Sequence, residues 1–238
     1  MLTPPTLRLF SRRSVSSVLL LRPVDLVASL QTTMDPATLA ESDPSLASGH
    51  RVFYEREVPF ELRTADGLEE PDEVGVLEAI KVKILGIGPE GAYTGLRVEL
   101  TSESNIFFHY VHELDQAGFR KMQEGQRLMV AFGDYPAVIL RELDRCVKEP
   151  HAHLAIFVMM KDGSARLDFV QNVEYKFVEL LSLKFAASEE ETVKEQVVFR
   201  YNAVKTKLAL AQARLADVNA LVKIKNPSLL LHMKKTGL

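Results

Sequence analysis

Apolar residues recur at heptad spacing near the end of the chain, and this pattern restricts the fold more than any other feature of the sequence. Between Ser188 and Pro227 the chain contains neither glycine nor proline, and Ser188 followed by acidic residues is typical of a helix start. The apolar positions alternate by four and three residues: Val197, Tyr201, Val204, Leu208, Ala211, Leu215, Val218 and Val222. Over about four heptads this spacing favours a coiled-coil helix, which we predict for residues 187–226.

A second interpretation of the same stripe stays open. One amphipathic helix that packs back on its own domain would need the same apolar face. In either case Pro227 ends the helix, and residues 227–238 form a short basic and apolar tail.

The region before this helix, residues 50–186, has the alternating pattern of a β-rich domain. Residues 52–63 predict the first strand, with a bulge or a sheet edge at Pro59. Further strands are predicted at 77–87, 96–102, 126–132, 153–160, 165–171 and 175–187. The turn Lys161–Ser164 between two apolar runs indicates a hairpin.

Two short helices are predicted within this domain. The first begins after Asp115, a good N-cap residue, and ends at Gly125. The second covers residues 134–149, with Asp134 as its cap and Pro136 in its first turn, where the missing N–H costs nothing.

Charge and cysteine content exclude two possibilities. The 238 residues carry a net charge of -3, so the chain lacks the large positive field that holds a nucleic-acid backbone. The single cysteine, Cys146, excludes an internal disulfide and fits a reducing compartment. Its neighbours Ile139 and Leu143 are apolar at helical spacing, so we expect Cys146 to be buried.

Residues 1–49 differ in composition from the rest of the chain and are expected to be disordered or targeting-like. No acidic residue precedes Asp25, and arginines occur among serines, as in a mitochondrial transit peptide. The apolar run Val18–Leu21 is far too short to span a bilayer. Three interpretations compete for residues 1–33: a targeting segment, a disordered arm, or a start placed too far upstream of a true start at Met34. The proline-, serine- and alanine-rich residues that follow indicate a linker.

No group of residues marks a catalytic or metal site. The spacing of Gly86, Gly88 and Gly91 matches a dinucleotide fingerprint, but a strand follows where phosphate binding needs a helix, so we expect a hairpin loop. The histidine pairs 109/112 and 151/153 lack the further converging ligands that zinc requires, and we expect the second pair to lie at a surface turn. We therefore predict no metal, no cofactor and no enzymatic activity.

Eight phenylalanines occupy core-like positions, and we expect most of them to belong to the core: Phe107, Phe108, Phe119, Phe132, Phe157, Phe169, Phe177 and Phe185. Tyr175 differs, because it comes just after polar residues and before the last strand. An aromatic side chain at a loop tip can fill a pocket on a partner.

An ordered set of short motifs begins with Asn-x-Phe-Phe at Asn105. The further pieces are Asp115 and Phe119, then Gly125, Leu128, Val130 and Phe132, then Tyr135 and Pro136, and finally Leu181, Ser182, Leu183 and Lys184. With these pieces in this order, residues 51–200 resemble the spindle assembly abnormal protein six family, the cartwheel proteins of centrioles and basal bodies.

The resemblance implies a seven-stranded β-sandwich or barrel with a helix-turn-helix insertion, followed by a parallel coiled-coil dimer. It also implies that heads pair through a hydrophobic residue before the last strand. That role falls on Tyr175, and the partner's pocket on residues 107–145. The family usually has Phe or Ile there, so the tyrosine hydroxyl must keep a hydrogen-bond partner. The coiled coil is short for the family, which suggests a short, spokeless relative of the kind found in flagellated and apicomplexan protists, or a truncated gene model.

These observations predict a non-enzymatic cytoskeletal assembly protein of the cytoplasm, located at centrioles, basal bodies, the flagellar base or apical structures. Its expected partners are copies of itself and other centriolar or flagellar proteins, with no nucleic acid and no membrane. One alternative is a DNA-repair scaffold of the same head-plus-coil architecture. The other is a mitochondrial adaptor, suggested only by residues 1–33.

Overall fold

The computed structural model of the chain describes residues 41–65, 76–89 and 91–225. All of them belong to one compact unit, Met34–Leu238. The predicted targeting segment 1–33, the start at Met34 and the basic tail 227–238 lie outside the described residues.

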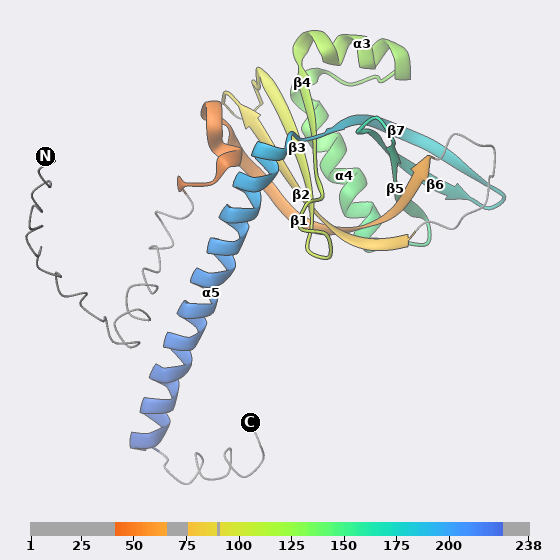
Figure 1. Ribbon diagram of the computed structural model, residues 1–238. Coiled ribbons are helices and arrows are strands. Elements are labelled where there is room, and N and C mark those ends of the chain that lie inside the picture. The colour runs from red at the N-terminus through yellow and green to blue at the C-terminus, as the bar shows by residue number, and fades with distance from the viewer. Residues whose placement is uncertain (1–40, 66–75, 90, 226–238) are drawn as a thin grey trace, which may run out of the picture. The chain divides into compact units, whose positions relative to one another are not determined.

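Seven strands close into one barrel in the order β1-β2-β3-β4-β7-β6-β5 (Figure 1). Their bounds are β1 Arg51–Ala65, β2 Val76–Ile87, β3 Gly95–Ser102, β4 His109–Asp115, β5 His153–Met160, β6 Ser164–Val173 and β7 Lys176–Ala187. The pairs are antiparallel, except that β1 and β5 close the barrel in parallel. The predicted mainly-β class with seven strands is confirmed, and in the closed barrel each strand pairs with a neighbour on both sides over at least part of its length.

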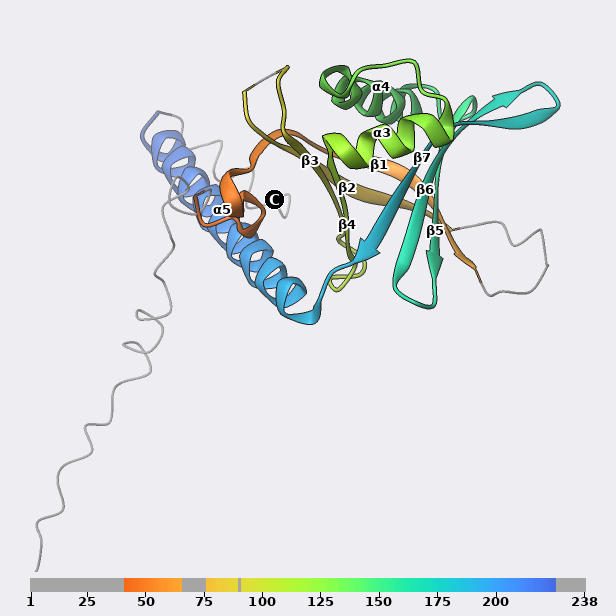
Figure 2. The ribbon, with the colours of Figure 1, turned by 90° about the horizontal axis from the view of Figure 1, so that it is seen from above.

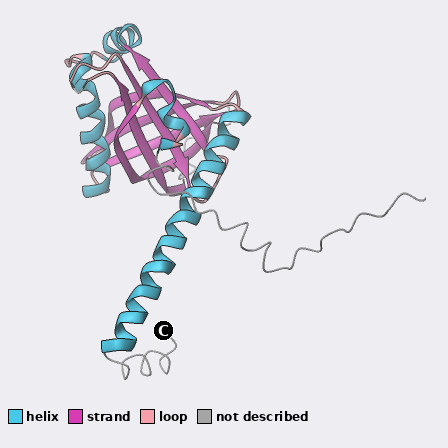
Figure 3. Ribbon diagram, turned by 90° about the vertical axis from the view of Figure 1, so that its left-hand side faces the viewer, coloured by secondary structure: helices cyan, strands magenta, loops and turns pink. Residues whose placement is uncertain are grey.

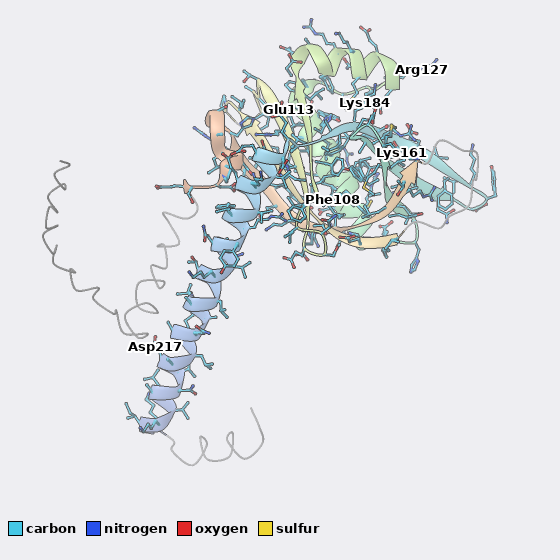
Figure 4. All side chains as sticks on the ribbon, in the orientation of Figure 1. Phe108, Glu113, Arg127, Lys161, Lys184 and Asp217 are labelled. Atoms are coloured by element: carbon cyan, nitrogen blue, oxygen red, sulfur yellow. The ribbon has the colours of Figure 1, made fainter. Side chains whose placement is uncertain are left out.

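Period-two alternation fills the barrel interior as the sequence predicts. In β2, Ile80, Val82 and Ile84 are fully buried, whereas Lys81 and Lys83 point to the outer face. The aromatic rings of Phe108, Phe157 and Phe185 meet inside the barrel, where the centroid of Phe157 lies 5.6 Å from each of the other two. Phe108 lies among the strands in Figure 4.

Pro59 lies within β1 without a bulge at that residue. The register shift of the β1–β2 pair falls between Val52 and Tyr54, so the predicted bulge at Pro59 is wrong. The parallel pairing with β5 starts only at Phe60, which leaves Pro59 with a strand neighbour on its β2 side alone. The predicted edge position is therefore right, because a residue without an N–H is tolerated where one side has no ladder partner.

Between β4 and β5 the chain forms α3 (Gln116–Gln126), the short 3₁₀ turn η2 (Phe132–Asp134) and α4 (Tyr135–Lys148). Both helices lie on one side of the strands (Figure 2). The Asp115 carboxylate accepts a 2.6 Å hydrogen bond from the Gly118 N–H and caps α3. These helices confirm the predicted insertion, and α4 buries Cys146 as expected.

The strand predicted at 126–132 does not exist. Gln126 still belongs to α3, and Arg127 then takes a left-handed conformation with φ 55° and ends the helix in place of Gly125. The side-chain amide of Gln123 donates 2.8 Å to the Val130 carbonyl and holds the segment as a loop. Leu128 and Val130 still pack on the core while Met129 between them is exposed, so this loop has the alternating pattern of a strand without strand pairing. The seventh strand is instead β4, whose residues were not predicted to form a helix or a strand.

Six of the eight phenylalanines at core-like positions are buried, which confirms the expectation that most of them belong to the core. The exceptions are Phe107 and Phe177, which are 68% and 60% exposed. Of the histidine pair expected at a surface turn, His151 is exposed but His153 is buried at the start of β5.

After β7 the chain forms one long helix, α5 (Glu190–Lys225), which continues past the strands in Figure 3. Its buried residues are Val193, Gln196 and Thr206, all in its first half. A short 3₁₀ segment before β1, η1 (Pro44–Gly49), packs at the same place, and its Ser45 is fully buried. The linker expected up to residue 49 is therefore part of the packed structure from residue 44 onward.

Candidate self-association surfaces

The hairpin between β6 and β7 carries the residue predicted to join heads. Glu174 has φ 45°, and the Tyr175 N–H donates to the Val173 carbonyl, which makes a tight turn. Tyr175 is 84% exposed, and Val173 and Phe177 beside it are also exposed. Together these three residues, named here the hairpin tip, present an apolar surface that nothing in the described chain covers.

A register shift explains why Phe177 faces outward. Phe169 pairs with Leu181 inside the barrel, but the next residue, Val170, pairs with Glu179. Leu180 is left without a counterpart, and the side on which successive β7 residues point is exchanged. Phe177 therefore pairs with Asn172 on the outer face. The simple alternation that placed Phe177 in the core could not include this bulge.

Within residues 107–145, where the resemblance places the partner's pocket, two large apolar side chains are exposed. Phe107 lies just before β4, and Met129, in the loop after α3, is 98% exposed. These residues are candidates for the surface that receives the hairpin tip.

Most of the heptad stripe of α5 is exposed to solvent, although Val197, Tyr201 and Val204 at its start line a groove between α5 and the barrel. Tyr201, Val204, Leu208, Ala211, Leu215 and Val218 are exposed, and Val197 and Val222 are partly buried. The barrel instead contacts a different face of α5, which contains Gln196 and Arg200. The Arg200 guanidinium donates 3.0 Å to the Ser102 carbonyl and also donates to the Ile106 carbonyl. From Leu208 onward the apolar stripe therefore does not pack back on the barrel.

Sequence reasoning missed Gln196, Arg200 and Ser45, which join α5 to the barrel. Gln196 and Arg200 are four residues apart, so they lie on one helix face. Polar residues at this spacing are usually solvated, and the sequence carries no signal that distinguishes these two from their neighbours.

Basic residues gather where α5 meets the barrel. His109 is buried beside them, and its burial, with smaller contributions from Arg200, Arg97 and Lys83, lowers its pKa to about 4. Its Nδ1 atom is hydrogen-bonded to the Ser188 hydroxyl. His109 is therefore a neutral structural residue near pH 7.

The remaining chemical motifs have structural roles. Gly88 and Gly91, with φ 104° and 78°, lie in the turn between β2 and β3, which confirms the hairpin loop. His112 is buried and hydrogen-bonded to the Lys184 carbonyl. Among the described residues, no cluster of three or more potential ligands for a metal ion occurs, and no helix has the length and apolar character needed to cross a membrane.

Comparison with known proteins agrees with the barrel and its long helix. The family model for the centriolar protein SAS N-terminal domain matches residues 52–185, more than half of the chain. The chain belongs to this family. The resemblance stated from the short motifs is thereby confirmed.

Relatives of the SAS-6 type have been characterised in several organisms. The chicken (Gallus gallus) spindle assembly abnormal protein 6 homolog is 25% identical over 124 residues, which cover 49% of this chain and 19% of that protein. The match thus spans about a fifth of the curated relative.

Solved SAS-6 structures share the fold. A Leishmania SAS-6 N-terminal fragment with parts of its coiled coil has a TM-score of 0.62 at 19% identity, covering 76% of this chain and 99% of that one. A Drosophila melanogaster Sas-6 fragment, dimerised via the coiled-coil domain, has a TM-score of 0.62 at 15% identity, covering 82% and 93%. An N-terminal coiled-coil dimer of C. elegans SAS-6 reaches 0.53 at 13% identity, covering 72% and 98%.

Proposed function

We propose that this SAS-6 family protein is a non-enzymatic structural subunit that assembles through two different surfaces. The heptad stripe of α5 pairs two chains, and the hairpin tip joins the head of one pair to the head of the next. Its site of action is the centriole, the basal body or the flagellar base in the cytoplasm, where its partners are copies of itself and other proteins of these structures.

The observation that carries the proposal is the exposure of two separate apolar surfaces on one chain. Leu208 and Leu215 on α5 are 57% and 59% exposed, and Tyr175 on the hairpin is 84% exposed. Soluble proteins seldom leave contiguous apolar surfaces uncovered unless a partner binds them. The Drosophila and C. elegans relatives form coiled-coil dimers, which supports the same pairing for α5.

Two different self-association surfaces on one chain lead to an extended assembly. A pair formed by α5 carries two heads, so contacts between heads continue from pair to pair until a ring closes or a filament forms. Each contact between heads can be weak, because closure of a ring supplies avidity.

Membership of the SAS family favours this function over the two alternatives. A DNA-repair scaffold is disfavoured because the match is to a centriolar family and because the net charge is -3. The mitochondrial adaptor depends on residues 1–33 alone, and no relative found here supports it.

Sedimentation velocity of the full chain over a concentration series tests the proposal. We expect species larger than a dimer for the wild type and dimers only for Tyr175→Glu, because a charge buried in a head contact stays unpaired. Tyr175→Phe is the matched control, since it keeps the ring, and it should assemble like the wild type. If Tyr175→Glu and the wild type form the same species, the head contact does not exist.

Localisation of the tagged chain tests the cellular part. The expected signal lies at centrioles or flagellar bases. A nuclear signal would favour the repair scaffold, and a mitochondrial signal that is lost on deletion of residues 1–33 would favour the adaptor.

A further inference from the structure

The segment before β1 lies at the point where α5 meets the barrel. Asp43 caps η1, with its carboxylate accepting a 2.9 Å hydrogen bond from the Ser45 N–H. Ser45 is fully buried, although it lies in a stretch whose composition indicates a linker. This segment, residues 43–49, also precedes residue 52, where the match to the family model begins.

One hydroxyl group joins three elements. The Ser45 Oγ donates 2.5 Å to the Glu99 carboxylate on β3, and it accepts 3.0 Å from the Lys83 ammonium on β2. It also accepts 3.1 Å from the side-chain amide of Gln196 on α5. A serine hydroxyl has one donor and two acceptor positions, so all of them are used. Ser45 thereby connects η1 to β2, β3 and α5.

The charges around Ser45 make this arrangement costly to disturb. The Glu99 side chain is 2% exposed, and Lys83 and Asp43, at 12% and 11%, form an ion pair over 2.7 Å. Buried charges are tolerated only while they stay paired and hydrogen-bonded. Displacement of η1 would leave both Glu99 and Lys83 with fewer partners.

The attachment of α5 is confined to its first half. Gln196 binds Ser45, Arg200 binds the end of β3, and Thr206 is the last buried residue of the helix within the described chain. Beyond Thr206 the helix is held by nothing in the described part of its own chain. The direction in which the whole helix leaves the barrel therefore depends on these few contacts.

We propose that residues 43–49 act as a clamp that fixes the direction of α5 relative to the barrel. The clamp thereby sets the angle between the heptad stripe and the hairpin tip, and Ser45 is its central positioning residue. In an assembly with two self-association surfaces, this angle decides whether successive contacts close into a ring of one size. This consequence rests on the proposed function, whereas the clamp itself does not.

Distances between paired spin labels on the full chain test the clamp directly. The spin labels are attached to cysteines introduced by two substitutions, Glu57→Cys on β1 and Asp217→Cys on the outer part of α5. Asp217 is marked in Figure 4. The native thiol of Cys146 stays unlabelled because it is buried and its pKa is raised to about 12. Dilution of the labelled chain into an excess of unlabelled chain restricts the measurement to distances within one chain.

We expect a narrow distance distribution for the parent protein and at least a doubling of its width for Ser45→Ala. Gln196→Glu should have the same effect, because the side chain keeps its size but loses the N–H that Ser45 accepts. Glu190→Gln is the matched control: it removes only the exposed pair of Glu190 with Lys194 on α5 and should leave the width unchanged. If Ser45→Ala does not fold, Gln196→Glu still tests the clamp, since Gln196 lies outside the barrel.

An unchanged width in Gln196→Glu and in any folded Ser45→Ala overturns the clamp. Sedimentation of the same variants without labels tests the consequence for assembly, where we expect a broader range of oligomers than in the wild type. A broadened distance with an unchanged set of oligomers overturns that consequence and leaves the clamp standing. If the wild type itself never exceeds a dimer, the proposed head contact fails, and the distance result still decides the clamp.

Discussion

The Nδ1 atom of His109, the first residue of β4, lies 2.7 Å from the hydroxyl oxygen of Ser188, which links β7 to α5. The imidazole is buried beside the basic residues that surround the start of the helix. Protonation of His109 would place a positive charge among Arg200, Arg97 and Lys83 without water to screen it. The junction between barrel and helix is thus built for a neutral histidine.

Stability should consequently fall in mild acid. The pKa of His109 is lowered from 6.5 to about 4 in the folded chain, so the unfolded chain binds more protons between these values. The free energy of unfolding should decrease as the pH falls from 6.5 towards 4, by up to about 3 kcal/mol from this residue, and this contribution should level off below pH 4. Urea unfolding at a series of pH values measures it.

Carboxylates titrate in part of the same pH range, so histidine variants are needed to isolate the contribution of His109 to the stability. His109→Gln should show a shallower loss of stability between pH 6.5 and 4 than the wild type. His151→Gln, at an exposed position, should follow the wild-type curve. Equal slopes for all three proteins would contradict the assignment.

The thiol of Cys146 should be almost unreactive in the folded protein. Burial, and to a smaller extent Glu142, raise its pKa from 9.0 to about 12, so the thiolate fraction at pH 8 is about 1000-fold lower than for a free cysteine. Reaction with Ellman's reagent should be slow in buffer and fast in 8 M urea, a standard denaturing condition. Fast reaction of the native protein, at the rate of the unfolded chain, would show that Cys146 is not buried.

Pairing of two chains should depend on the heptad stripe. Leu208→Glu places a charge in the centre of the predicted seam in both chains, so the dimer should weaken by about 100-fold or more. Leu210→Glu is the matched control, because Leu210 is 41% exposed and lies outside the stripe. Sedimentation equilibrium measures both. Equal weakening by the two substitutions would argue against a specific seam.

Replacement of Tyr175 by phenylalanine should preserve or strengthen the contact between heads. The ring keeps its volume, and a hydroxyl that must find a hydrogen-bond partner is removed, which favours association by about 1 kcal/mol if the pocket is dry. Sedimentation velocity of wild-type and variant dimers over a concentration series measures how strongly their heads associate. A loss of association in Tyr175→Phe would instead mean that the hydroxyl donates to a specific group in the partner's pocket.

Two glycine-to-alanine changes should have opposite effects on stability. A Cβ atom at Gly86 in β2 would lie 2.6 Å and 2.8 Å from two ring carbons of Tyr93, which stacks on Phe53. Gly86→Ala should therefore lower the free energy of unfolding by about 1 to 3 kcal/mol. Gly125→Ala, in α3 with nothing within 4 Å, should raise it by about 0.5 to 1 kcal/mol. Thermal unfolding compares both with the wild type, and a stable Gly86→Ala would mean that Tyr93 moves freely.

Much of this fold could be predicted from the sequence, because helix starts and hairpin turns depend on residues that are neighbours in the chain. Asp115 starts α3, Pro136 lies in the first turn of α4, and the run around Gly163 forms the β5–β6 hairpin, as expected from the sequence. The motif order in residues 105–147 led to the family that the comparison shows.

The errors have one cause in common. Loop 127–131 packs on the core without strand pairing, and a register shift opposite Phe169 turns Phe177 outward. Both depend on partners that are distant in sequence. Alternation indicates that a residue packs against something, but it does not specify against what.

For the candidate surfaces too, some features follow from the sequence and others depend on the tertiary structure. The heptad stripe from Val197 to Val222 follows from sequence spacing alone, because 3.5-residue periodicity defines one helix face regardless of the surroundings. That most of this face stays exposed was decided by the tertiary structure, because Arg200 and Gln196 on another face make the hydrogen bonds to the rest of the chain. The role of Ser45 was decided there as well. A serine in a stretch of linker composition acquires a position only when Glu99, Lys83 and Gln196, from three distant parts of the chain, come within hydrogen-bonding distance of one hydroxyl group.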